Sequence, residues 1–214
     1  WVIIMEIIAH RGMWKNELER NTKKALFLAL EHGYGIETDI RDFQGRLVIS
    51  HDIPTADSPA LFELFEFYQK NNYKTSLALN VKADGIQQLL IDMLQTYQIK
   101  NYFLFDMSIP EQVVNCGLGL KFFTRNSDIE EQCVLYQQAE GVWIDSFYND
   151  NWLTNNIIRN HLDCGKRICI VSPELHHKSH ANVWKMLKDN KYTQYEAACL
   201  CTDNPEKARE FFKI

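Results

Sequence analysis

The sequence alternates between short apolar runs and stretches with helical periodicity, and this alternation limits the possible folds more than any other feature. The runs are too evenly apolar for a sheet with one solvated face, so we expect strands that are buried on both faces. Strands are expected at Val2–Ala9, Gly35–Ile40, Leu47–Ser50, Ser76–Val81, Tyr102–Asp106, Lys121–Thr124, Gly141–Asp145, Arg167–Val171 and Ala197–Thr202. Helices are expected at Thr22–Glu31, Pro59–Lys70, Gly85–Tyr97, Pro110–Asn115, Asp128–Gln138, Trp152–Leu162, Ala181–Asn190 and Pro205–Phe212.

The number of repeats favours one architecture. If Leu47–Ser50 is a short strand that returns along Gly35–Ile40, the 214 residues contain eight βα units. Eight units predict an α/β fold, a compact (β/α)8 TIM barrel that forms a single domain over residues 1–214. The alternative is an open, doubly wound sheet, which usually has fewer strands, and no Gly-x-Gly-x-x-Gly motif follows the first expected strand.

Composition excludes several classes of protein. The chain is 46% hydrophobic, which argues against disorder, and its 28 acidic and 23 basic residues argue against nucleic-acid binding through bulk charge. The six cysteines form no Cys-x-x-Cys pair and lie mostly in apolar or amphipathic runs, so we expect reduced thiols and a cytoplasmic location. The apolar run Trp1–Ala9 contains Glu6 and is too short for a transmembrane segment, so we expect a buried strand there.

Two acidic residues on the second expected strand suggest a metal site. Glu37 and Asp39 flank Thr38, and the two-residue period of a strand directs both carboxylates to the same face. Carboxylate oxygens suit a hard divalent cation such as Mg²⁺ or Ca²⁺. The alternative is an ion-pair network in which Arg41 or Lys82 neutralises the two acids.

Two histidines stand at the ends of apolar runs. His10 follows the first expected strand, and His51 follows the short returning strand. Because imidazole titrates near neutral pH, two histidines near one metal ion would form a general acid–base pair. A single histidine at such a position would carry little weight.

The spacing of these residues resembles the glycerophosphodiester phosphodiesterase family of the phosphatidylinositol phosphodiesterase-like TIM barrels, in a short form without the usual insertion. Later segments also look like family landmarks, so the resemblance spans the chain, although its specific motifs lie in residues 10–52. The motifs are His10-Arg11-Gly12, Asn21-Thr22, Glu37-x-Asp39 and His51-Asp52, and the later landmarks are 172–175 and 202–205.

The resemblance implies a metal-dependent hydrolase that acts on a small glycerophosphodiester or a similar alcohol phosphodiester, in lipid metabolism. It implies that Glu37 and Asp39 bind Mg²⁺ or Ca²⁺, and that His10 and His51 act as acid and base. Charge that accumulates on the phosphate could be offset by the metal and by two cationic side chains, which are those of Arg11 and Lys82.

The sequence departs from the family pattern at three points. Asn80 stands where the family usually has a third acidic metal ligand; its carbonyl oxygen can still coordinate, but the site carries one negative charge fewer. Arg20 replaces a glutamate, and no insertion follows His51-Asp52. Two alternatives therefore stay open. One is a weakened relative that binds a phosphorylated ligand or partner, and the other is a monoester phosphatase. The sequence does not indicate an oligomeric state.

Overall fold

The computed structural model describes residues 4–149 and 151–214, so residues 2–3 of the first expected strand lie outside the described residues. The strands are β1 (Glu6–His10), β2 (Gly35–Phe43), β3 (Arg46–Ile49), β4 (Leu77–Val81), β5 (Tyr102–Phe105), β6 (Phe123–Ser127), β7 (Gly141–Asp145), β8 (Arg167–Val171) and β9 (Ala198–Thr202). The α-helices are α1 (Lys23–Glu31), α2 (Leu61–Lys70), α3 (Gln87–Thr96), α4 (Ile109–Gly117), α5 (Asn155–Asp163), α6 (Ala181–Asp189) and α7 (Pro205–Phe212).

The chain has the α/β fold of a (β/α)8 TIM barrel, which confirms the predicted fold class. The paired strands run parallel except for β3, which is antiparallel to β2. The chain divides into two compact units. The first unit is Ala9–Phe122, and the second is Phe123–Ile214 together with the described residues up to Ile8. The extent of the domain over residues 1–214 stays a prediction.

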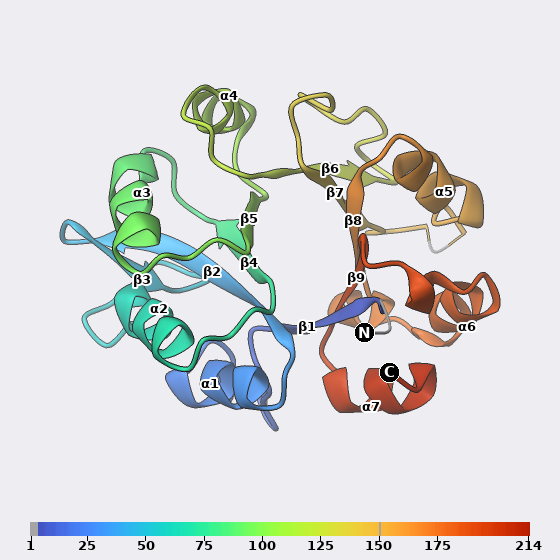
Figure 1. Ribbon diagram of the computed structural model, residues 1–214, viewed down its shortest axis with the longest axis horizontal. Coiled ribbons are helices and arrows are strands. Elements are labelled where there is room, and N and C mark those ends of the chain that lie inside the picture. The colour runs from blue at the N-terminus through green and yellow to red at the C-terminus, as the bar shows by residue number, and fades with distance from the viewer. Residues whose placement is uncertain (1–3, 150) are drawn as a thin grey trace. The chain divides into compact units, whose positions relative to one another are not determined.

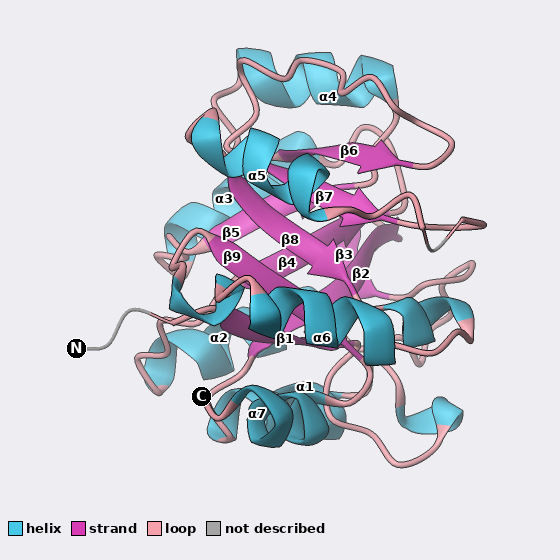
Figure 2. Cartoon of the chain, turned by 90° about the vertical axis from the view of Figure 1, so that its right-hand side faces the viewer, coloured by secondary structure: helices cyan, strands magenta, loops and turns pink. Residues whose placement is uncertain are grey.

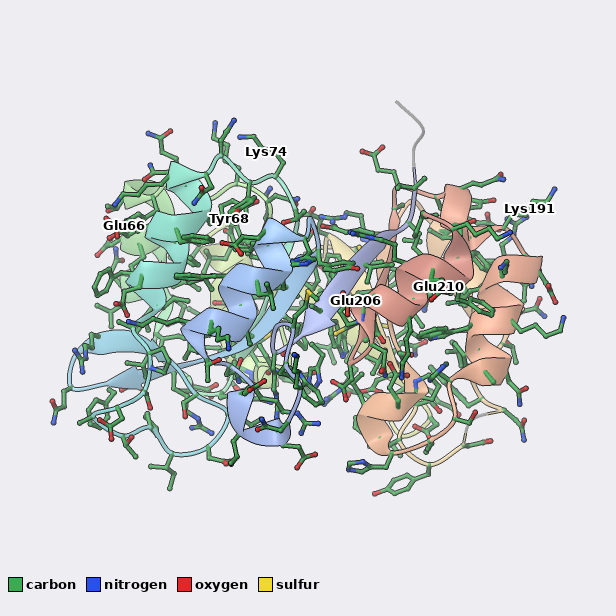
Figure 3. All side chains as sticks on the ribbon, turned by 90° about the horizontal axis from the view of Figure 1, so that it is seen from below. Glu66, Tyr68, Lys74, Lys191, Glu206 and Glu210 are labelled. Carbon is green, nitrogen blue, oxygen red and sulfur yellow. The ribbon has the colours of Figure 1, made fainter. Side chains whose placement is uncertain are left out.

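In the first unit, the central strand β4 pairs with β2 on one side and with β5 on the other. Helices α1, α2 and α3 succeed one another beside these strands in Figure 1. Phe27 of α1 stacks on Phe67 of α2 with ring centroids 3.9 Å apart. Figure 3 labels two residues of α2, of which Tyr68 is buried and donates a hydrogen bond to the Thr75 carbonyl, whereas Glu66 pairs with Lys70 at the surface.

The short returning strand that the sequence predicts is the second arm of a β-hairpin. Gln44 and Gly45 have φ angles of 50° and 78°, the left-handed pair that a tight two-residue hairpin turn requires. Beyond β3, the Ser50 amide donates to the Asp39 carbonyl at 3.0 Å. The hairpin therefore leads the chain from the carboxyl end of β2 back to Asp39 in the middle of that strand, one residue before His51.

In the second unit, β9, β8, β7 and β6 pair in that order, and Figure 2 shows α5 and α6 lying over these strands. The helix predicted at Asp128–Gln138 is wrong, because this connection consists of turns. Groups that a helix would use in its first turn are bound elsewhere, namely the Asp128 side chain, which could cap it, and two carbonyls. Asp128 accepts hydrogen bonds from three amides of residues 147–149, and the Asn126 side chain donates to the carbonyls of Glu130 and Glu131.

Among the described residues, no helix combines the length and the apolar content that crossing a membrane requires. The six cysteines are all free thiols, as the sequence predicts.

Candidate active site

The loop after β1 turns tightly against the neighbouring elements of the first unit. Arg11 adopts a left-handed φ of 55°, and its amide donates to the Glu37 carbonyl at 3.0 Å and lies 3.2 Å from Glu37 Oε2. Gly12 follows with φ 88°, and a Cβ atom at this position would lie 2.5 Å from the Ala25 carbonyl carbon. Glycine at position 12 is therefore dictated by the close approach of the backbone to α1.

Glu37 and Asp39 share one face of β2, as the two-residue period predicts. Both are buried, with 1% and 0% of their surface exposed. Arg11 Nε lies 3.0 Å from Asp39 Oδ2, and Lys82 Nζ lies 3.6 Å from Asp39 Oδ1. Of the two cations considered as partners for the acids, Lys82 lies beside Asp39, whereas Arg41 donates both its Nε and Nη2 hydrogens to the His51 carbonyl.

The pKa of the buried Glu37 carboxyl group is raised well above its ordinary value. Burial and the neighbouring charge of Asp39 raise the pKa of Glu37 to about 7, against the lowering effects of His10, Arg11 and Lys82. His10 Nε2 lies 3.8 Å from Glu37 Oε2, and the His10 carbonyl accepts a 2.9 Å hydrogen bond from the Trp14 indole. An imidazole and a carboxyl group that exchanges protons near neutrality are therefore neighbours.

Asn80 joins these residues through the register of the sheet. It is the cross-strand partner of Asp39 and is buried at 7% exposure. Two buried oxygens at this point accept no hydrogen bond. One is Asn80 Oδ1, and the other is Asp39 Oδ1, which has the Lys82 ammonium 3.6 Å away. A buried acceptor without a donor is costly unless something else satisfies it.

The oxygen atoms of these three side chains are suitable ligands for the divalent cation that the sequence suggests. Within the described part of the chain, no three side chains of His, Cys, Asp or Glu gather into a metal-binding group. Two carboxylates and one amide oxygen are nevertheless an oxygen set that a hard divalent cation accepts, with water completing its coordination. Glu37, Asp39 and Asn80 therefore could hold Mg²⁺ or Ca²⁺.

The position of His51 relative to these residues is defined by fewer contacts. Its side chain is 46% exposed, and its Nδ1 atom lies 2.9 Å from Asp52 Oδ1. None of the hydrogen bonds or ion pairs described for residues 4–149 joins His51 to His10, Glu37 or Asp39. The hairpin brings the chain back beside Asp39 one residue before His51, but the role of His51 stays a prediction.

Asn21 is a site residue to which the sequence analysis gave no role of its own. Its Nδ2 atom donates to Asp39 Oδ2 at 2.8 Å, and its Oδ1 atom accepts from the Thr38 hydroxyl at 2.8 Å. Asn21 also has a left-handed φ of 60°. The only local signal is its place before Thr22, which caps α1, and such an asparagine usually signals no more than a turn.

No family model matches the sequence, and no curated protein sequence matches it. Solved structures do resemble it in fold. A candidate glycerophosphodiester phosphodiesterase from Galdieria sulphuraria has a TM-score of 0.79 and 20% identity, over 100% of this chain and 99% of its own. A glycerophosphodiester phosphodiesterase from Parabacteroides distasonis has a TM-score of 0.68 and 18% identity, over 98% and 97% of the two chains.

A third similar structure holds a small molecule. It is an Oleispira antarctica phosphodiesterase in complex with the product sn-glycerol-3-phosphate, with a TM-score of 0.69, 16% identity, and coverage of 99% of this chain and 98% of its own. At these identities the likeness establishes the fold. It agrees with the family resemblance that the sequence motifs suggest.

Proposed function

We propose that this chain is a metal-dependent phosphodiesterase, a phosphoric diester hydrolase that cleaves a glycerophosphodiester or a similar alcohol phosphodiester. The observation that carries the proposal is the cluster of His10, Arg11, Glu37 and Asp39. It lies at the carboxyl end of β1 and in the stretch of β2 that pairs with β4, Ile36–Ile40. Active sites of barrels with this fold lie at the carboxyl ends of the strands. Two of the solved structures named above, which share this fold, are phosphodiesterases.

The proposed acid and base are His10 and His51. One imidazole removes a proton from the attacking oxygen, and the other protonates the oxygen of the departing alcohol. Two contacts support a fixed position for His10. The Trp14 indole donates a hydrogen bond to the His10 carbonyl, and His10 Nε2 lies 3.8 Å from Glu37 Oε2. His51 is more exposed and turns one ring nitrogen toward Asp52, which leaves room for it to meet a substrate that arrives from solvent.

Arg11 and Lys82 are the proposed partners of the phosphate. Both cations already lie beside Asp39, at 3.0 and 3.6 Å. A bound phosphodiester would bring a second anion close to these two cations. Their N–H groups would then stabilise the negative charge that develops on the non-bridging oxygens in the transition state.

Glu37, Asp39 and Asn80 would hold the divalent cation, Mg²⁺ or Ca²⁺. When bound, such an ion offsets negative charge on the phosphate oxygens and helps to orient the diester. The buried oxygens of Asp39 and Asn80 that accept no hydrogen bond support this assignment.

The test is hydrolysis of a panel of glycerophosphodiesters with added Mg²⁺, Ca²⁺ or Mn²⁺, in which the released alcohol is measured. We expect turnover that a chelator abolishes and that falls about 10² to 10⁴-fold in His10→Ala. Release of inorganic phosphate from monoesters without diester cleavage would favour a phosphatase. No turnover, with ligand binding intact in His10→Ala, would favour the weakened relative that only binds a phosphorylated compound.

The proposal also places this activity in the cytoplasm, as part of lipid metabolism. The six free thiols support a reducing compartment. The expected partner is the small-molecule diester rather than nucleic acid.

A further inference from the structure

The amide of Asn80 sits between two carboxylates on neighbouring strands. Strand β4 lies between β2 and β5, with Asp39 of β2 directly opposite Asn80. On the other side, Asn80 pairs with Phe105 of β5, and the next residue is Asp106. Asn80 Nδ2 donates to Asp106 Oδ2 over 3.4 Å. The amide nitrogen therefore faces β5.

The direction of the amide nitrogen fixes the direction of the amide oxygen. The two atoms branch from one planar carbon, so a nitrogen held toward Asp106 leaves the oxygen free to face the side of β2. Asn80 Oδ1 is buried and accepts no hydrogen bond, and the same is true of Asp39 Oδ1 on the facing strand. If the amide were reversed, its oxygen would meet the Asp106 carboxylate, which is a repulsive arrangement.

The backbone of Asp106 is suited to this contact. Its φ is 61°, a left-handed value that aspartate, asparagine and glycine tolerate better than other residues do. This conformation follows directly after the last residue of β5 and turns the chain out of the sheet. The carboxylate is consequently held beside β4 at the same edge as the candidate metal ligands.

We propose that Asp106 is a positioning residue, which holds the Asn80 amide so that its oxygen, and not its nitrogen, is presented to the divalent cation. This inference rests on the cation site of the proposed function and adds to it the reason why an amide can serve there. An aspartate at position 80 would offer an oxygen in either orientation. An asparagine offers an oxygen in only one of its two amide orientations, and the negative charge of Asp106 favours that orientation before the cation binds.

Direct binding of Ca²⁺ and Mg²⁺ to the full chain, measured by isothermal titration calorimetry, tests the inference. Asp106→Gly removes the carboxylate, and Asp106→Asn removes only its charge, while both residues accept the left-handed backbone. We expect Asp106→Gly to weaken cation binding about 10 to 100-fold, the usual effect of losing a group that orients a metal ligand, and Asp106→Asn to weaken it less. Thermal unfolding in a chelator checks that each variant folds.

The decisive comparison repeats Asp106→Gly in an Asn80→Asp background. A carboxylate at position 80 needs no orientation, so there the loss of Asp106 should change cation affinity by less than about threefold. The matched control is Asp84→Asn, which removes one negative charge from the connection after β4. The Asp84 carboxylate accepts a hydrogen bond from Ser108 and is not bonded to Asn80. This control should bind the cation as the unaltered chain does.

Three results would overturn the inference. Asp106→Gly could bind the cation as tightly as the unaltered chain, or it could lose the same factor in both backgrounds, which would mean that Asp106 acts without Asn80. Either result leaves the proposed cation site intact. If the unaltered chain binds neither cation, the inference fails together with the metal dependence of the proposed function.

Discussion

The buried Glu37 carboxyl group makes a specific prediction about stability and pH. Its pKa in the folded chain is about 7, raised from an ordinary value of 4.5 by burial and by Asp39. Between these two values the folded chain binds a proton that the unfolded chain has released. Stability from this group is therefore fully present below pH 4.5 and is lost as the pH rises toward 7.

The size of the effect follows from the two pKa values. Each unit of difference corresponds to 1.36 kcal/mol, so Glu37 alone should lower the free energy of unfolding by about 3 kcal/mol between pH 4.5 and pH 8. Glutamine at this position has nearly the same shape and does not titrate. Glu37→Gln should therefore lack this component, and it should gain stability relative to the unaltered chain as the pH rises.

Urea unfolding from pH 5 to pH 8 with a chelator present measures this difference. The matched control is Glu66→Gln on the outer face of α2, where the glutamate is partly exposed and pairs with Lys70. Its pH profile should run parallel to that of the unaltered chain. If the profile of Glu37→Gln is also parallel, then Glu37 is ionised throughout and the reasoning from burial and charge repulsion is refuted.

Four further substitutions test other predictions. Gly12→Ala should cost about 2 kcal/mol or more of unfolding free energy in urea titrations, because its Cβ would clash with backbone 2.5 Å away at a positive φ; an unchanged midpoint would contradict the close approach. Asp39→Ala should lose activity that excess divalent cation partly restores, whereas His51→Ala should lose about 10² to 10⁴-fold that no cation restores. The hydrogen bond that His176 Nε2 donates to Asp145 Oδ1 raises the pKa of His176, so stability from this pair is present below pH 6.5 and is lost as the pH rises through the folded pKa. Asp145→Asn should lower the His176 pKa in an NMR titration; an unchanged pKa would rule out the pair as its cause.

The fold could be predicted because its main determinant is local. A strand buried on both faces reads as an apolar run, and a helix reads as a 3.6-residue period, so the order of elements follows directly from the sequence. The helix predicted at Asp128–Gln138 is wrong because the local sequence looks helical, whereas contacts with a distant part of the chain decide its structure. Asp128 looks like a helix cap, but its carboxylate is used by amides about twenty residues further along the chain. Such competition is not visible in a window of sequence.

At the candidate site, too, some features could be predicted from the local sequence and others could not. Glu37 and Asp39 were predictable as a pair because strand periodicity alone puts them on one face. The raised pKa of Glu37 was not, since it depends on the extent of burial and on which cations approach. The part that Asp106 plays is also non-local, because only the pairing of β4 with β5 brings it to Asn80.

Residues with positive φ angles fall into two groups, one that local sequence explains and one that it does not. Asn72 and Gln98 have positive φ angles just after the ends of α2 and α3, where left-handed residues commonly terminate helices. Arg11, Asn21 and Asp106 also have positive φ angles, but they do not end α-helices. Each instead contacts a residue on β2 or β4 at the candidate site. Such conformations typically cost about 1–3 kcal/mol each for residues other than glycine and persist where surrounding contacts enforce them. Of the ten residues other than glycine with positive φ in the described part of the chain, these three lie against the two buried acids and Asn80, where the hydrogen bonds that they make offset the backbone cost.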